Sequence, residues 1–231
     1  TPLYSSAASD VYKRQYIDGV KVAENTNWTT DVNSGGSLMR IGRRAVSSNF
    51  EHYFNGYISN VRIVKGTALY TTNFTPSSQP LTAVAGTGLL TLQDNRFIDR
   101  STNNFAITRV GDTRITPFSP FLPQTPYISS VHGGSAYFNG VGDFLSLPVS
   151  AAQLGTGNFT LQLWVYPQLA ANLAIFDSRG ASTSGDGWFL HYTAAGTFTF
   201  SNDGSSVISS TTNTAPLNVC LLYTSPSPRD S

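Results

Sequence analysis

The sequence predicts an all-β fold, an antiparallel sandwich of two sheets, on three observations. Short runs of alternating apolar and polar residues recur along the chain, bounded by Gly, Asn, Asp and Pro. Charged residues make up 12% of the chain, against roughly 25% in an average globular domain. Helical periodicity is nearly absent, and the 40% of hydrophobic residues is ample for a core.

Two hairpins are indicated by turn residues. In YIDGVKV, residues 16–22, the pair Asp18-Gly19 favours the positive φ angles of a type I′ turn. A second hairpin is expected over Gly196 to Ser209. There Phe198 and Phe200 precede an Asn202-Asp203-Gly204 turn and Val207 follows it.

The run FTLQLWVYP, residues 159–167, predicts a long strand with one apolar face. Because successive side chains of a strand point to opposite faces, the odd-numbered positions share the core face. These positions are Phe159, Leu161, Leu163 and Val165, and the opposite face carries Thr160, Gln162, Trp164 and Tyr166.

The run FNGYISNVRIVK, residues 54–65, changes its parity in the middle. Phe54, Gly56 and Ile58 share one face, whereas Val61 and Ile63 share the other. Both sets can face one core only if an extra residue is inserted near Ser59-Asn60, which predicts a β-bulge. Two separate short strands are the alternative.

Both ends of the chain resemble translated sequencing adapter. Ser5 to Gln15 (SSAASDVYKRQ) and Cys220 to Asp230 (CLLYTSPSPRD) back-translate into the two adapters of a transposase-cut library. We therefore expect residues 1–15 and 220–231 to be adapter-derived and exclude them from fold reasoning. On this interpretation the natural segment, truncated on both sides, is residues 16–219, and it contains no cysteine from which a redox compartment could be inferred.

The charge of that segment argues against nucleic acid as a partner. Removing Lys13, Arg14 and Arg229 from the 14 basic residues, and Asp10 and Asp230 from the 13 acidic ones, leaves no net charge. Without a basic field or a Lys/Arg run, attraction to nucleic acid or anionic lipid is not expected. No run of about 18 apolar residues occurs, so membrane insertion is not expected either.

Several motifs resemble a laminin-G-like domain of the concanavalin-A-like lectin/glucanase superfamily. YIDGVKV, SLMRIGRR and FNGYISNVRIVKG resemble its closing half, with a continuation similar to repeats in phage tail and marine metagenomic proteins. SAYFNGVGDFLSLP, FTLQLWVYP and IFDSRG resemble its opening half. The resemblance implies a jelly-roll sandwich, either incomplete or circularly permuted.

The resemblance also implies an order of segments. Residues 16–80 would be the C-terminal half of one repeat, 81–134 an inter-repeat connection with short strands, and 135–219 the N-terminal half of the next repeat. Each half alone would expose the apolar faces of its sheets, so we expect the halves to pack as one sandwich. A full repeat would also contain a central strand pair that this chain lacks, and Val11-Tyr12 or Leu221-Leu222 are candidates to fill its place.

Catalysis is not expected. Glucanases of this superfamily need carboxylates that flank the glycosidic bond, whereas the only glutamates here are Glu24 and Glu51, and no Glu-x-Asp-x-Glu pattern occurs. His52, His132 and His191 lack a nearby nucleophile and metal-type spacing. The sequence therefore argues against an enzyme.

Calcium is a candidate cofactor, because related domains hold this ion at the sandwich rim through carboxylate and carbonyl oxygens. The best candidate ligands are Asp143 and Asp177. The alternative is that these aspartates cap turns.

Carbohydrate is the main candidate ligand, because lectin sites combine an aromatic face with planar polar groups on rim loops. One loop offers Asp177, Arg179, Asp186, Trp188 and His191, and another offers Arg43, Arg44, Asn49 and His52. The alternative for Trp188 is that its ring simply covers the sheet. Trp164 is expected to belong to the core and not to the ligand site.

These observations predict a non-catalytic adhesion module that recognises surface carbohydrate, in an extracellular protein or on a virion surface such as a phage tail fibre. A structural spacer without a ligand is one alternative. An accessory module of a larger carbohydrate-active enzyme is another.

Overall fold

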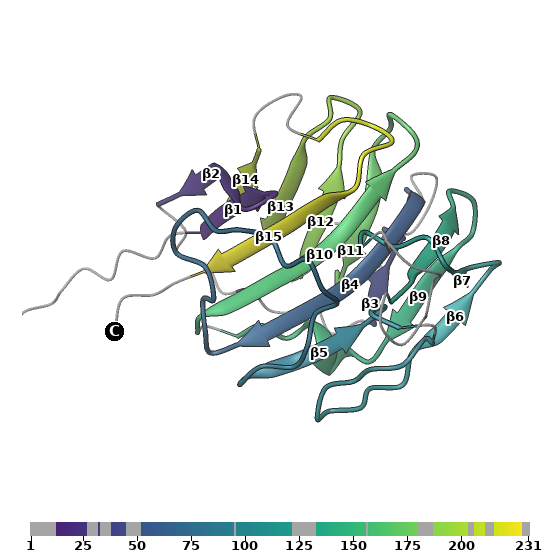
Figure 1. Ribbon diagram of the computed structural model, residues 1–231, viewed down its shortest axis with the longest axis horizontal. Helices are drawn as coiled ribbons and strands as arrows, with labels where there is room; N and C mark the ends of the chain where they lie inside the picture. Colours follow the sequence, from purple (N-terminus) through teal and green to yellow (C-terminus); the bar gives the residue numbers. More distant parts are fainter. Residues whose placement is uncertain are drawn as a thin grey trace, which may run out of the picture.

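The computed structural model describes residues 13–26, 32, 38–44, 52–94, 96–121, 133–155, 157–179, 187–202, 206–210 and 215–227. They form two antiparallel sheets that pack face to face around one core (Figure 1). This arrangement confirms the all-β antiparallel sandwich.

The eight-stranded sheet has the order β2-β1-β15-β10-β4-β8-β7, with β5 paired to β4. Its strands are β2 (Val20–Asn25), β1 (Lys13–Ile17), β15 (Leu221–Ser227), β10 (Phe159–Pro167), β4 (Asn55–Lys65), β8 (Ser135–Asn139), β7 (Arg114–Thr116) and β5 (Thr87–Thr91). The strands β8 and β5 pair with successive parts of β4.

The seven-stranded sheet has the order β14-β13-β12-β11-β3-β9-β6. Its strands are β14 (Ser206–Ser209), β13 (Phe198–Asn202), β12 (Trp188–Tyr192), β11 (Leu173–Asp177), β3 (Met39–Ile41), β9 (Phe144–Leu147) and β6 (Thr108–Val110). A short 3-10 helix, η1 (Val149–Ala152), follows β9 and contributes two buried alanines.

Strand β10 confirms the predicted alternation. Phe159, Leu161, Leu163 and Val165 are buried in the core between the sheets. The opposite face is also partly covered, since Thr160 Oγ1 accepts a hydrogen bond from Leu69 N at 2.8 Å and donates one to Thr67 O at 3.0 Å. Trp164 lies on this outer face against Phe121, with ring centroids 5.5 Å apart, so its expected place in the core is wrong.

The β-bulge in β4 is confirmed where the change of parity predicts it. Gln162 pairs with Arg62 and Trp164 with Ser59, so two residues of β4 oppose the single Leu163. Asn60 takes the left-handed conformation, with φ 51°. The bulge lets Ile58 and Val61 both reach the core and turns Arg62 outward, away from the core cluster.

Both hairpins form as expected. Ile17 pairs with Val20 across Asp18 (φ 49°) and Gly19 (φ 78°), the positive-φ pair of a type I′ turn. A Cβ at Gly19 would lie 1.8 Å from the Phe74 carbonyl oxygen, so only glycine fits there. Strands β13 and β14 form the second hairpin, but its turn residues 203–205 lie outside the described residues.

The two predicted half-repeats interleave in both sheets, as expected for one sandwich. From residues 16–80, β4 lies between β10 and β8, and β3 lies between β11 and β9, all four partners coming from residues 135–219. Residues 81–134 add β5, β6 and β7, of which β6 and β7 are edge strands. Leu221-Leu222 takes a strand position in β15, whereas Val11-Tyr12 lies outside the described residues.

Candidate functional site

The outer face of the seven-stranded sheet carries the polar residues that alternate with its core residues. In β3, Met39 and Ile41 are buried, which turns Arg40 outward. In β12, Trp188, Leu190 and Tyr192 face the core, which turns Phe189 and His191 outward.

The two candidate loops from distant parts of the sequence meet on this face. Strand β3 pairs with β11, placing Arg40 opposite Asp177, and β11 pairs with β12, placing Asp177 opposite Phe189. Arg44 N donates to His52 O at 3.0 Å, and the His52 and His191 rings lie 6.3 Å apart. The partly buried residues that share this place are Arg40, Arg44, His52, Phe189 and His191, hereafter the outer-face cluster.

Asp177 and Arg179 form a buried ion pair with each other. Arg179 Nη2 donates to Asp177 Oδ2 at 2.6 Å and Nε to Oδ1 at 3.1 Å, and the side chains are 7% and 0% exposed. The guanidinium also lies over the Phe189 ring, 3.9 Å from its centroid. The structure therefore places both residues in an internal ion pair beneath the outer-face cluster, and their role as sugar contacts stays a prediction.

Trp188 is fully buried in the core. Its Nε1 donates to Ala152 O at 2.7 Å, and its ring stacks on Phe200 with centroids 5.5 Å apart. An indole with no exposed surface has no face open to a sugar ring, so its burial favours the alternative that Trp188 covers the sheet. The alternation of β12 places it inward with Leu190 and Tyr192.

The surroundings of both imidazoles in the cluster disfavour their charged forms. Burial, reinforced by Arg179, Arg44 and His52, lowers the pKa of His191 to about 3. Burial and the charge of Arg44 lower the pKa of His52 from its ordinary value. The positive charge of the cluster therefore comes from its arginines.

Two buried polar atoms of the cluster lack a hydrogen-bond partner within the part of the chain that the structure describes. These atoms are Arg44 Nε and His191 Nε2. Most buried polar groups in proteins are hydrogen-bonded, so each such exception requires an explanation. Burial and Arg179 lower the pKa of Arg44, while Asp177 raises it.

The other predicted site residues are Arg43, which contacts two aromatic rings, and residues outside the described part of the chain. Arg43 lies over the rings of Phe144 and Tyr53, at 4.9 and 5.5 Å from their centroids. Asn49 and Asp186 fall outside the described residues, as do Glu51 and His132.

The two aspartates proposed as calcium ligands are occupied by the protein itself. Asp143 accepts backbone N–H bonds at both oxygens, from Asp112 at 2.5 Å and Asn139 at 3.0 Å. Asp177 is held by Arg179. The described residues contain no group of three or more His, Cys, Asp or Glu side chains suited to a metal. The backbone hydrogen bonds of Asp143 favour the alternative that this residue caps turns.

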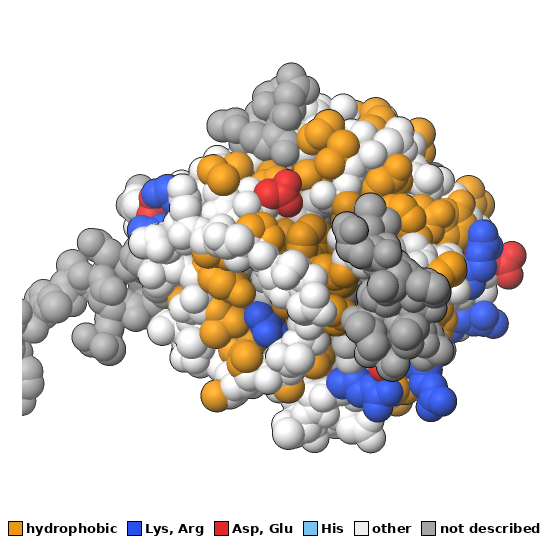
Figure 2. Space-filling view, viewed as in Figure 1, with side chains coloured by type: hydrophobic (Ala, Val, Ile, Leu, Met, Phe, Trp, Pro, Cys, Tyr) orange, Lys and Arg blue, Asp and Glu red, His pale blue; other side chains and the backbone are white. Residues whose placement is uncertain are grey.

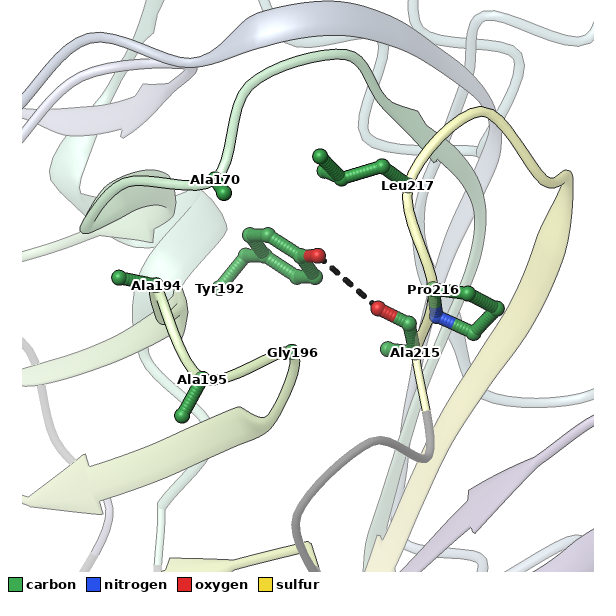
Figure 3. A pocket seen from close by; sticks show the side chains of 8 residues that line it. All are labelled: Ala170, Tyr192, Ala194, Ala195, Gly196, Ala215, Pro216 and Leu217. Atoms are coloured by element: carbon green, nitrogen blue, oxygen red, sulfur yellow. Dashed lines mark hydrogen bonds between the residues drawn. The ribbon is translucent and has the colours of Figure 1, made fainter.

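A separate pocket of about 260 Å³ opens beside the end of β12 (Figure 3). Its lining is mostly small and apolar, and the Tyr192 hydroxyl that faces it donates to Ala215 O at 2.9 Å. The other lining residues are Ala170, Ala194, Ala195, Gly196, Pro216 and Leu217. This pocket offers no charged side chain and contains none of the predicted site residues.

Arg40 and Phe189 were missed by the sequence reasoning, although a signal for both existed. The alternation in MRI places Arg40 opposite to Met39 and Ile41, and the alternation in WFLHY pairs Phe189 with His191. The alternation of side chains along a strand, which predicts the buried face of β10, would also have placed Arg40 and Phe189 on the outer face.

The fold and the site together define a class: an all-β protein of two antiparallel sheets with an arginine-containing cluster on the outer face of one sheet. Comparison with protein-family models, with curated proteins and with solved structures found no match. Among the residues that the structure describes, no helix is long and apolar enough to cross a membrane.

Proposed function

We propose that this chain is a non-catalytic binding module that recognises surface carbohydrate through the outer-face cluster. The observation that carries the proposal is the convergence of Arg44 and His52 with His191, from segments more than a hundred residues apart. Arg44 Nε and His191 Nε2 are buried there without a partner from the described residues. Because both atoms are buried, a ligand oxygen could bond to them only after the side chains that cover them move aside.

The charge of the cluster favours acidic carbohydrate. A guanidinium binds a carboxylate or a sulfate through two parallel hydrogen bonds, which no neutral hydroxyl can match. Asp177, the carboxylate of this region that the structure describes, is already paired with Arg179. Arg40 and Arg44 are therefore left to face a ligand. The laminin-G-like resemblance and a place on a virion or cell surface are consistent with this function.

Replacing Arg44 with glutamine is expected to weaken binding to acidic glycans by about tenfold or more, the effect of losing one charged hydrogen bond. The protein is first screened on an array of neutral, carboxylated and sulfated glycans. The best ligand is then titrated by calorimetry against the wild type and Arg44→Gln. Lys21→Gln is the matched control, because it removes one positive charge from β2 of the other sheet.

The outcomes separate the alternatives. Equal loss in both variants would show a nonspecific charge effect and contradict the assignment of the cluster. No binding to any glycan would support the spacer alternative instead.

Glycan affinity is expected to be unchanged by EDTA. Both oxygens of Asp143 already accept backbone hydrogen bonds and Asp177 pairs with Arg179, so calcium would have to compete with or share these contacts. Calorimetric titrations with EDTA and with added calcium measure this directly. A calcium-dependent affinity would show that the metal ligands lie elsewhere in the chain.

A further inference from the structure

The outer face of the eight-stranded sheet contains a second pocket, of about 350 Å³. It lies where residues 67–84, the connection between β4 and β5, cross the sheet (Figure 1). Its lining includes Arg62, Leu69, Tyr70, Pro80, Leu81 and Thr82. Figure 2 views this side of the molecule and shows mainly uncharged and hydrophobic side chains over its centre.

Arg62 is a cation buried in this pocket. It is 6% exposed, because the bulge in β4 turns it outward under the crossing segment. Its Nη1 donates to Thr82 O at 2.8 Å and its Nη2 to Gln162 Oε1 at 2.7 Å. Its Nε is buried without a hydrogen-bond partner from the described parts of the chain.

The partners of Arg62 are all neutral. Among the described residues no carboxylate forms an ion pair with it, whereas Arg14, Arg100 and Arg179 each have one. Burial lowers the pKa of Arg62, with Tyr70 opposing the shift. Arginine nevertheless stays charged in proteins. A buried charge is costly unless an opposite charge accompanies it.

Tyr70 places a hydroxyl next to the guanidinium. Gln162 Nε2 donates to the Tyr70 hydroxyl oxygen at 3.5 Å, so the three side chains form one polar floor. The Tyr70 ring is held by stacking on Phe74 at 3.8 Å between centroids. The hydroxyl proton is thus available to a second acceptor, and Leu69, Pro80 and Leu81 provide apolar walls.

We propose that this pocket binds a small organic monocarboxylate, with the carboxylate on Arg62 and Tyr70 and the apolar body against Leu69, Pro80 and Leu81. One buried cation matches one anionic group, and the apolar walls favour a ligand with a compact hydrocarbon part over a bare inorganic anion. This site lies on the other sheet from the outer-face cluster and does not depend on the carbohydrate proposal.

Benzoate, its neutral analogue benzamide and inorganic phosphate are the probes. Benzoate at millimolar concentration is expected to shift the Arg62 Nε–H resonance and to raise the melting temperature. Benzamide and phosphate are expected to do neither. Arg62→Met should weaken benzoate binding by about tenfold or more, and Tyr70→Phe by several-fold.

Two variants separate a specific loss of benzoate binding from a loss of folding or of positive charge. Tyr70→Phe keeps the ring that stacks on Phe74, so it reports on binding even if Arg62→Met perturbs the fold. Arg96→Met, at an exposed arginine, is the matched control and should bind benzoate as the wild type does. No response to benzoate, or equal responses to benzamide or phosphate, would overturn the monocarboxylate site.

Discussion

Deleting residues 220–231 is expected to abolish the cooperative folding of this chain. These residues supply β15, which lies inside the eight-stranded sheet and pairs with β1 on one side and β10 on the other. Without it, β1 loses a partner and β10 exposes one edge, a template for aggregation. The hairpin of β1 and β2 would then keep little contact with the sheet.

The side chains of β15 explain the size of the effect. Tyr223 is fully buried, with its ring 5.1 Å from that of Phe198, and Gln15 Nε2 donates to its hydroxyl at 3.1 Å. Leu221 belongs to the same core. Each buried side chain of this size contributes roughly 1.5–3 kcal/mol, and a domain retains only about 5–15 kcal/mol in total.

Chemical denaturation followed by circular dichroism and tryptophan fluorescence tests this expectation. The deletion variant should show either no cooperative unfolding transition or a midpoint at a much lower denaturant concentration. In size-exclusion chromatography it should elute as aggregate. Deleting only residues 228–231, beyond the end of β15, is the control and should leave the midpoint unchanged. An unchanged transition in the longer deletion would contradict the role of β15.

Strand β15 lies within the C-terminal segment that resembles translated adapter. Leu221 and Tyr223 both reach the core, and the alternation and apolar content of the segment suffice to place them there. If the segment is adapter-derived, a sequence without a structural history completes the sheet. This is physically reasonable, because strand pairing is made by the backbone and requires of the side chains only a compatible pattern.

Local patterns predicted the elements well, for identifiable reasons. The parity change at Ser59-Asn60 and the Asp18-Gly19 turn each depend on a few adjacent residues, and the structure contains both features. The neighbours of β4 in the sheet depend instead on contacts with residues 135–139 and 159–167, which no local pattern specifies. Strand order was therefore less predictable than strand position.

The same distinction applies to the candidate site. The approach of His52 to His191 depends on the pairing of β3 with β11 and of β11 with β12, and on the Arg44–His52 backbone bond, none of which a local pattern specifies. The burial of Asp177 could not be foreseen, because a polar residue at a strand end suits a ligand site as well as an internal ion pair. Trp188 was predictable from its neighbours in β12, but the glycine-rich sequence that precedes it suggested exposure.

Replacing Asp177 with asparagine is expected to lower the free energy of unfolding by about 3–5 kcal/mol, the cost of breaking a buried ion pair from one side. The change leaves the Arg179 guanidinium buried without its countercharge. Arg179 and Asp177 also act in opposite directions on the pKa of Arg44, so the loss of Asp177 leaves the repulsion between the two guanidinium groups without its offset.

Asp94→Asn is the matched control, because Asp94 pairs with Arg100 at 2.8 Å with side chains 21% and 50% exposed. An exposed pair contributes only about 0–1 kcal/mol, so this variant should unfold at nearly the wild-type urea concentration. The double variant Asp177→Leu with Arg179→Met removes both charges together and should recover much of the lost stability. Equal small losses in Asp177→Asn and Asp94→Asn would mean that the Asp177–Arg179 pair is solvated in solution, and the outer face would then present a free carboxylate that opposes acidic glycans.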